Sequence, residues 1–200
     1  MKPSRADLLA AAGTTIPDVL GDDLEVLFCG INPGLWSGWS GQHFARPGNR
    51  FWAALHRSGF TPRLLAPSEQ YLLPSYGLGI TNLVPRASAR ADELGREELV
   101  EGGVGLAAKV RAARPRWLAV VGVTAYRVAF ATPRATVGPQ GDLLGDTRIW
   151  VLPNPSGLNA HYDLAQLGDE FARLREAALT SGASKKRVTR SKRDGSARFC

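Results

Sequence analysis

The sequence has few of the residues that bind metal ions or form disulfide bonds. Its 200 residues include two cysteines, three histidines and one methionine. Iron–sulfur clusters and cysteine-rich zinc sites need more thiol and imidazole ligands than this, so we expect no metal and no cofactor of that kind. Cys29 lies in an apolar run and Cys200 at the last position, which disfavours a disulfide between them. This cysteine usage predicts a cytoplasmic protein.

Long apolar runs and targeting signals are missing as well. No stretch approaches the roughly 18 apolar residues that a membrane span needs, so we expect no membrane partner. The first residues, MKPSRADLLAAAG, include Asp7 and no long apolar core, so they do not predict a signal peptide. Hydrophobic residues make up 44% of the chain, a share typical of globular proteins. We therefore expect a single domain over residues 1–182.

Positive charge is concentrated in one segment of the chain. The net charge is +7, and residues 184–200 contain seven basic residues against one acidic residue. The rest of the protein is therefore nearly neutral. Segments of this kind are commonly disordered and bind polyanions by releasing counterions. We expect residues 183–200 to form a basic, disordered tail that contacts nucleic acid, with a merely solubilising end as the alternative.

Apolar runs of strand length alternate with stretches of helical character. Buried strands are expected at residues 24–30, 78–84, 116–122 and 147–153. Helices are expected at residues 48–59, 67–73, 95–115, 123–131 and 162–182, after a short first helix capped by Ser4. Gly102 and Gly103 should interrupt the helix at 95–115. The alternation predicts an α/β fold, a three-layer α/β/α sandwich around a central, mostly parallel sheet.

Two short turns rich in Asn, Pro and Gly each follow an expected strand. GINPG (residues 30–34) follows the first strand, and NPSG (residues 154–157) follows the last. Ligands of parallel α/β sheets bind beyond the carboxyl ends of the strands, so the two turns could face each other across one cleft. No Gly-Lys-Ser/Thr follows the first turn, which excludes a phosphate-binding P-loop.

Asn32 and Leu158 are the candidate functional residues of these turns. A constrained turn can aim the Asn32 amide outward, where it can hold a water molecule or hydrogen-bond a planar heterocycle. The alternative is that Asn32 only forms the turn. Leu158 follows polar turn residues, so it could project from the protein and wedge between stacked bases. Packing of Leu158 onto the core is the alternative.

Four segments, in the same order, resemble the mismatch-specific uracil-DNA glycosylases, the bacterial relatives of thymine-DNA glycosylase. They are FCGINPGL, HFARPGNRFW, GITNLVPR and WVLPNPSGLN, and the resemblance spans residues 24 to about 175. It implies a uracil-DNA glycosylase-like fold and a monofunctional, cofactor-independent glycosylase of base-excision repair. Such an enzyme flips uracil out of mismatched double-stranded DNA, hydrolyses the N-glycosidic bond and leaves an abasic site. The resemblance also implies a monomer that works at the nucleoid.

The resemblance assigns roles to individual residues. Asn32 would position the attacking water, Ile31 would offer backbone groups to the edge of the pyrimidine, and Phe44 would stack on the flipped base. Leu158 would fill the vacated space, and Gly157 would contact the widowed guanine. The other residues of that loop would shape it and touch the DNA: Asn154, Ser156 and Asn159.

The chain departs from the family pattern in two segments. A basic residue often stands two positions after the wedge leucine, but this chain has Ala160 there, with His161 next. Mispairs without guanine, and single-stranded uracil, therefore stay open as substrates. Trp36 and Trp39 stand where small polar residues are expected. They could narrow the pocket, stack on DNA bases or simply pack within the protein.

Polar residues near the same sheet edge could assist catalysis. Asp92 and Glu93 are the nearest acids after the strand at 78–84, and we favour Asp92 as a supplementary base. Otherwise these acids begin the following helix, where negative charge is favourable. Asn82, near the end of that strand, is a further candidate for contact with the substrate.

Two other classes of function stay open. A non-catalytic module could use the same cleft to recognise mismatched or abasic sites in DNA without releasing a base. A small-molecule enzyme acting on nucleosides could share the fold, although a free nucleoside needs neither a wedge leucine nor a basic tail. The intact GINPG turn favours the glycosylase.

Overall fold

The computed structural model describes the backbone of residues 2–194 and the side chains of residues 2–180, and it contains one five-stranded sheet. The strands are β1 (Val26–Gly30), β2 (Leu78–Asn82), β3 (Trp117–Val121), β4 (Gly138–Leu144) and β5 (Thr147–Leu152). Their order across the sheet is β2-β1-β3-β5-β4. Neighbouring strands are parallel except β4 and β5, which are antiparallel. The mostly parallel sheet is therefore confirmed.

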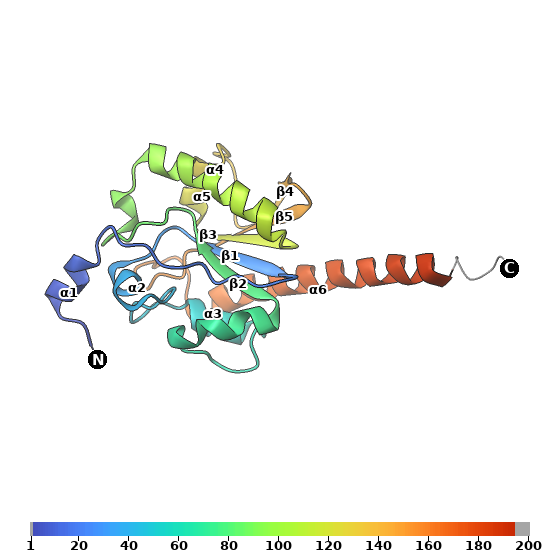
Figure 1. Ribbon diagram of the computed structural model, residues 1–200, viewed down its shortest axis with the longest axis horizontal. Coiled ribbons are helices and arrows are strands. Elements are labelled where there is room, and N and C mark those ends of the chain that lie inside the picture. The colour runs from blue at the N-terminus through green and yellow to red at the C-terminus, as the bar shows by residue number, and fades with distance from the viewer. Residues whose placement is uncertain (1, 195–200) are drawn as a thin grey trace.

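Helices cover both faces of this sheet (Figure 1). On one face lie α4 (Arg96–Ala113) and α5 (Val123–Ala129). On the other face lie α3 (Phe51–Arg57), the 3-10 helix η1 (Pro67–Tyr76) and α6 (Leu164–Asp194). The connections hold α1 (Arg5–Ala10), α2 (Leu35–Ser40) and the 3-10 helix η2 (Ala91–Glu93). This is the α/β/α sandwich that the sequence predicts.

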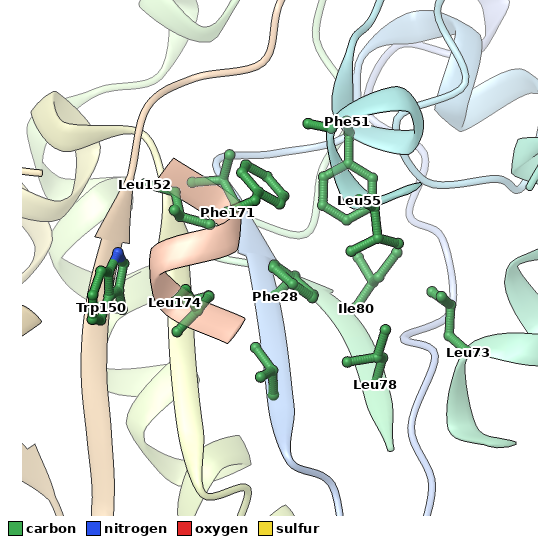
Figure 2. Close-up of a cluster of buried hydrophobic side chains, with 14 of the residues drawn as sticks. Phe28, Phe51, Leu55, Leu73, Leu78, Ile80, Trp150, Leu152, Phe171 and Leu174 are labelled. Carbon is green, nitrogen blue, oxygen red and sulfur yellow. The ribbon is translucent and has the colours of Figure 1, made fainter. Parts of the chain in front are cut away.

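Alternation along the strands divides the core into two clusters. Val26 and Phe28 of β1 belong to the cluster under α3 and α6. Leu27 and Cys29 belong to the cluster under α4 and α5. In the first cluster, Phe28 stacks on Phe171 of α6 with ring centroids 5.7 Å apart (Figure 2). Burying a side chain of this size contributes about 1.5–3 kcal/mol, so the two clusters fix the register of the sheet and the position of its carboxyl edge.

The glycines of α4 do not interrupt the helix. Gly102 and Gly103 lie inside α4, which is continuous, so the expected break is wrong. A Cβ on Gly102 would lie 2.6 Å from the carbonyl oxygen of Leu83. A Cβ on Gly103 would lie 2.6 Å from the carbonyl oxygen of Ala129. The two glycines let α4 approach its neighbours closely, a tertiary requirement that outweighs their low helix propensity.

Three local features were not predicted from the sequence. The helix expected to stop before Pro74 continues to the end of η1 as a 3-10 helix. Strand β4 is rich in Gly, Pro and Asp, a composition typical of loops, but it pairs with β5 through a two-residue turn in which Gly145 has φ +61°. Helix α2 forms inside the Trp-rich segment, with Gly34 at its N-cap.

Helix α6 extends away from the body of the protein toward the C-terminus (Figure 1). Its backbone includes residues 183–194, the greater part of the expected basic tail. Disorder of this tail stays a prediction, and residues 195–200, with Cys200, lie outside the described residues. Within residues 2–194, no helix is long and apolar enough to span a membrane.

Candidate active site

A cleft of about 890 Å³ opens at the carboxyl edge of the parallel strands. Segments following β1 and β5 both line it, so the two Asn-Pro turns face one cleft, as the sequence predicts. Gly157 is the one predicted site residue that does not line it; a Cβ there would lie 2.7 Å from the carbonyl oxygen of Gly48. The predicted site residues that line it are Ile31, Asn32, Phe44, Asn82, Asp92, Asn154, Ser156, Leu158 and Asn159.

The Asn32 side chain is fixed in one orientation. Its Nδ2 donates to the carbonyl oxygens of Pro33 (3.2 Å) and Arg86 (3.0 Å), and to Ser88 Oγ (2.8 Å). Carbonyl oxygens only accept hydrogen bonds, so the nitrogen must face them and Oδ1 must point elsewhere. Among the backbone groups of residues 2–194 and the side chains of residues 2–180, no donor bonds to Asn32 Oδ1. The cleft therefore contains an oriented amide oxygen that can accept a hydrogen bond from a water molecule.

The segment after β2 holds this amide in place, a role that the sequence did not reveal. Ser88 is buried, and its hydroxyl donates to the carbonyl oxygen of Arg90 at 2.7 Å, so it is left to accept from Asn32. Arg86 forms a bidentate ion pair with Glu98 at 2.6 and 2.8 Å. This bond from Arg86 lowers the pKa of Glu98 to about 2, so the pair persists at neutral pH.

The backbone at the end of β1 is partly committed to the fold. The carbonyl oxygens of Gly30 and Ile31 accept from the N–H groups of Leu83 and Val84, each at 2.9 Å. The N–H groups of Ile31 and Asn32 have no acceptor in the part of the chain that the structure describes. The turn can therefore offer N–H donors to a ligand in the cleft.

Phe44 has a backbone conformation that aromatic residues rarely adopt. Its φ is +53°, in the left-handed region, where a side chain with a Cβ is strained. The ring stacks on Phe51 with centroids 4.0 Å apart and an interplanar angle of 15°. Phe44 also lines the cleft. Because Phe51 covers one face of the ring, the strained backbone presents the other face to a planar ligand.

Asn82 reaches the cleft from the end of β2. It is buried, and its Nδ2 lies 3.3 Å from Nδ1 of His43. A Cβ on Gly30 would lie 2.7 Å from Asn82 Oδ1 and 3.2 Å from Cζ of Phe44. Only glycine at position 30 leaves room for these two side chains to meet at the floor of the cleft.

The loop after β5 is held by one arginine. The Arg50 guanidinium donates to the carbonyl oxygens of Ser156 (2.6 Å), Asn159 (2.9 Å) and Tyr162. Its Nε and its backbone N–H both donate to the carbonyl oxygen of Pro155, at 3.4 and 3.0 Å. The segment HFARPGNRFW is thereby fastened to NPSGLN. Sequence reasoning missed Arg50, because nothing in its local pattern names a partner beyond residue 150.

Leu158 projects from this loop. Its side chain is 73% exposed, so packing onto the core is excluded. The loop beneath it is bonded internally: the Leu158 N–H donates to Ser156 Oγ (3.3 Å), and Asn159 Nδ2 donates to the carbonyl oxygen of Asn154 (2.9 Å). An apolar side chain held out on a rigid loop beside a cleft suits insertion between stacked bases.

Asp92 lies at the rim of the cleft within an ion pair. Its carboxylate oxygens accept from Arg90 Nε at 3.0 Å and Nη2 at 2.5 Å, and its side chain is 63% exposed. Both carboxylate oxygens are already bonded to one guanidinium. The geometry thus does not favour Asp92 as a base, and its catalytic role stays a prediction.

The three positions that depart from the family pattern, Trp36, Trp39 and Ala160, do not line the cleft. Trp36 and Trp39 pack edge to face on each other, with ring centroids 6.2 Å apart, and neither lines the cleft. They therefore do not narrow the pocket. His161 lines the cleft, and its N–H donates to Asn159 Oδ1 at 3.1 Å.

Comparison with known proteins gives two findings. A family model described as the uracil DNA glycosylase superfamily matches residues 17–179. The fold is similar to the solution NMR structure of a candidate uracil DNA glycosylase from Methanosarcina acetivorans, with a TM-score of 0.55 at 20% sequence identity. That similarity covers 82% of this chain and 98% of the other. At this identity, it supports a shared fold.

Proposed function

The chain belongs to the uracil-DNA glycosylase superfamily, and on this basis we propose that it is a monofunctional, mismatch-directed DNA glycosylase of base-excision repair. It removes uracil and related bases from mismatched double-stranded DNA and leaves an abasic site. It acts as a monomer at the nucleoid and needs no cofactor. The observation that carries the proposal is the Asn32 amide, which lines the cleft: its nitrogen is bound by three acceptors, while its oxygen accepts from no donor in the described part of the chain.

Capture of the base comes first in this proposal. Flipping a base out of the duplex costs a few kcal/mol, and less at a mismatch. The flipped base stacks on the ring of Phe44 and meets Asn82 at the floor of the cleft. Leu158, on the loop that Arg50 fastens, enters the vacated space and delays the return of the base.

Cleavage then follows a loose path. As the bond between C1′ and N1 breaks, its electron pair leaves with the base, and positive charge develops on the sugar. The N–H groups of Ile31 and Asn32 stabilise the departing anion, as an oxyanion hole does. A water held by Asn32 Oδ1 bonds to C1′ and loses a proton to solvent, and the base leaves as neutral uracil after protonation. Since an amide is a weak base, we expect modest turnover.

The proposal is tested by single-turnover release of base from labelled DNA. Substrates are duplexes with U·G, U·A and T·G pairs, together with single-stranded uracil. Release of free uracil from the U·G duplex is the expected result, and the other substrates define the mismatch and strand preferences. If the protein binds mismatched or abasic DNA but releases no base from any substrate, it is a non-catalytic recognition module.

Ser88→Ala should slow base release moderately. The change removes one of the three acceptors that orient Asn32 Nδ2, and a typical hydrogen bond contributes about 1 kcal/mol, so the rate should fall about fivefold. Single-turnover kinetics on the U·G duplex measures it. Ser58→Ala is the matched control, because it removes a buried hydroxyl that donates to the carbonyl oxygen of Leu55 and does not line the cleft. An equal loss in both variants would contradict the orienting role of Ser88.

Leu158→Ala should impair action on paired DNA without weakening the fold. The side chain is 73% exposed, so the free energy of unfolding should change by no more than about 0.5 kcal/mol. Release of uracil from U·G should fall on the order of tenfold or more, because an unfilled stack readmits the base. Uracil opposite an abasic position, where no partner base pulls it back, should be affected less. Equal losses on both substrates would rule out the wedge.

A further inference from the structure

Asn82 is one end of a chain of hydrogen bonds that leaves the cleft and ends on the backbone. Its Nδ2 lies 3.3 Å from Nδ1 of His43, and Nε2 of His43 lies 2.9 Å from the carbonyl oxygen of Pro17. All but about 1% of His43 is covered by the surrounding protein. Nothing in the sequence pattern singles out His43, which precedes Phe44 in the segment HFARP.

The carbonyl oxygen of Pro17 sets the positions of the protons in this chain. A carbonyl only accepts, so Nε2 of His43 must carry the ring proton. Burial lowers the pKa of His43, which disfavours a second proton on Nδ1. Nδ1 is therefore an acceptor, and it pairs with the nitrogen of the Asn82 amide. A reversed amide would bring Oδ1 against the Nδ1 lone pair, so two acceptors would repel each other.

This orientation decides what the cleft presents to a flipped base. Asn82 Oδ1 lies beside Gly30, near the ring of Phe44. A Cβ added to Gly30 would be 2.7 Å from Oδ1 and 3.2 Å from Cζ of Phe44. No donor bonds to Oδ1 from the described backbone (residues 2–194) or the described side chains (residues 2–180). The amide thus keeps one acceptor and one remaining N–H. Uracil has an N3–H donor beside an O4 acceptor, which matches this pair, whereas cytosine has an N3 acceptor beside an amino donor, which opposes it.

We propose that His43 is a positioning residue that locks the Asn82 amide in the orientation that accepts uracil and rejects cytosine. The proposal deepens the proposed function and rests on it. The lock is passive: Pro17 fixes the tautomer of His43, and the tautomer of His43 fixes the amide. Without the lock, the amide is free to rotate, and the reversed amide matches the hydrogen-bonding edge of cytosine.

The test measures discrimination between bases rather than activity alone. The probes are two duplexes with uncleavable 2′-fluoro nucleotides, one of uracil and one of cytosine, each opposite an abasic position so that pairing contributes equally. We expect the wild type to bind the uracil duplex more tightly. His43→Phe has no acceptor at the position of Nδ1. In this variant, the dissociation constant for the cytosine duplex divided by that for the uracil duplex should fall about tenfold. His43→Gln, whose amide can still accept from Asn82, should recover part of the ratio.

A matched core variant separates positioning from stability. Leu65→Ala removes a side chain that is 2% exposed and does not line the cleft. It should weaken the fold while leaving the ratio unchanged. If His43→Phe behaves in the same way, His43 has only a structural role and the proposal is overturned. Should His43→Phe fail to fold, His43→Gln and the imidazole ¹⁵N shifts of the wild type decide: a proton on Nδ1 and none on Nε2 would overturn the lock.

The same experiment distinguishes failure of the lock from failure of the proposed function. A wild type that releases uracil from U·G and prefers the uracil probe, with variants that keep its ratio, contradicts the role of His43 alone. A wild type that releases no base from any substrate contradicts the proposed function. A wild type that binds both probes equally while still releasing uracil contradicts base reading by Asn82, and with it the lock.

Discussion

Asn32→Ala is expected to reduce single-turnover release of uracil on the order of 10³-fold, while binding to the U·G duplex changes little. The variant loses the oriented oxygen that holds the attacking water, but it keeps the stacking ring of Phe44 and the exposed wedge of Leu158. It also leaves the acceptors at Arg86 and Ser88 without their shared donor. The unfolding free energy should therefore fall by about 1–2 kcal/mol, too little to account for the loss of rate.

Asp92→Ala is the natural comparison for this experiment. Its carboxylate lies on the same cleft, but it is solvated and paired with Arg90. If Asn32 acts alone, Asp92→Ala should retain most of the wild-type rate. A loss in Asp92→Ala as large as that in Asn32→Ala would assign a base to the carboxylate. Full activity of Asn32→Ala would remove the central observation of the proposed function.

Arg50→Ala is expected to have the second largest effect, and it should act on both stability and catalysis. Its guanidinium bonds the carbonyl oxygens of four residues in the loop after β5. Hydrogen bonds to a charged donor contribute about 1.5–3 kcal/mol each, but loss of partners is not additive, so we expect a loss of about 2–4 kcal/mol in unfolding free energy. Denaturant unfolding with an unchanged m-value measures it.

Catalysis by Arg50→Ala should fail chiefly on paired DNA. The loop that carries Leu158 would lose its anchor, and a displacement of about 1 Å at such a site costs on the order of 10²-fold in rate. Arg50→Lys should restore little, because a single ammonium cannot span acceptors that a planar guanidinium reaches together. Uracil opposite an abasic position should be released at a rate closer to wild type. If the rate of base release falls equally on both substrates, and only as far as the loss of folded protein explains, the anchoring role of Arg50 is contradicted.

Much of the fold could be predicted because it depends on local patterns. The apolar runs at β1, β2, β3 and β5 bury both faces of a strand, and each is bounded by turn residues. The capping box of Ser4 and Asp7 is equally local, since both bonds lie within one helical turn. Where the predictions were wrong, a neighbour decided the outcome. Gly102 and Gly103 stay in the helix because it packs directly against the backbone of Leu83 and Ala129. A Cβ at either position would collide with a carbonyl oxygen of that backbone.

The candidate site was also predictable only in part, and again the local features were the predictable ones. The sequence placed two Asn-Pro turns at one edge of the sheet, and it placed Leu158 on a polar loop where it stays exposed. It did not reveal Ser88, Arg50 or His43. Each of these residues acts through partners elsewhere in the chain, and no periodicity or turn pattern encodes such a pairing.

By itself, the sequence determined the layers of the sandwich, the edge at which the cleft opens and the chemical types gathered there, because periodicity and turn chemistry act over a few residues. Only the tertiary structure decided which atom of each side chain faces the cleft. Asn32 is oriented by residues 54 and 56 positions away, and the wedge loop is anchored from Arg50 across as many as 112 positions. Hydrogen bonds are directional, so the free oxygen of Asn32 is a consequence of where the fold places the acceptors for its nitrogen.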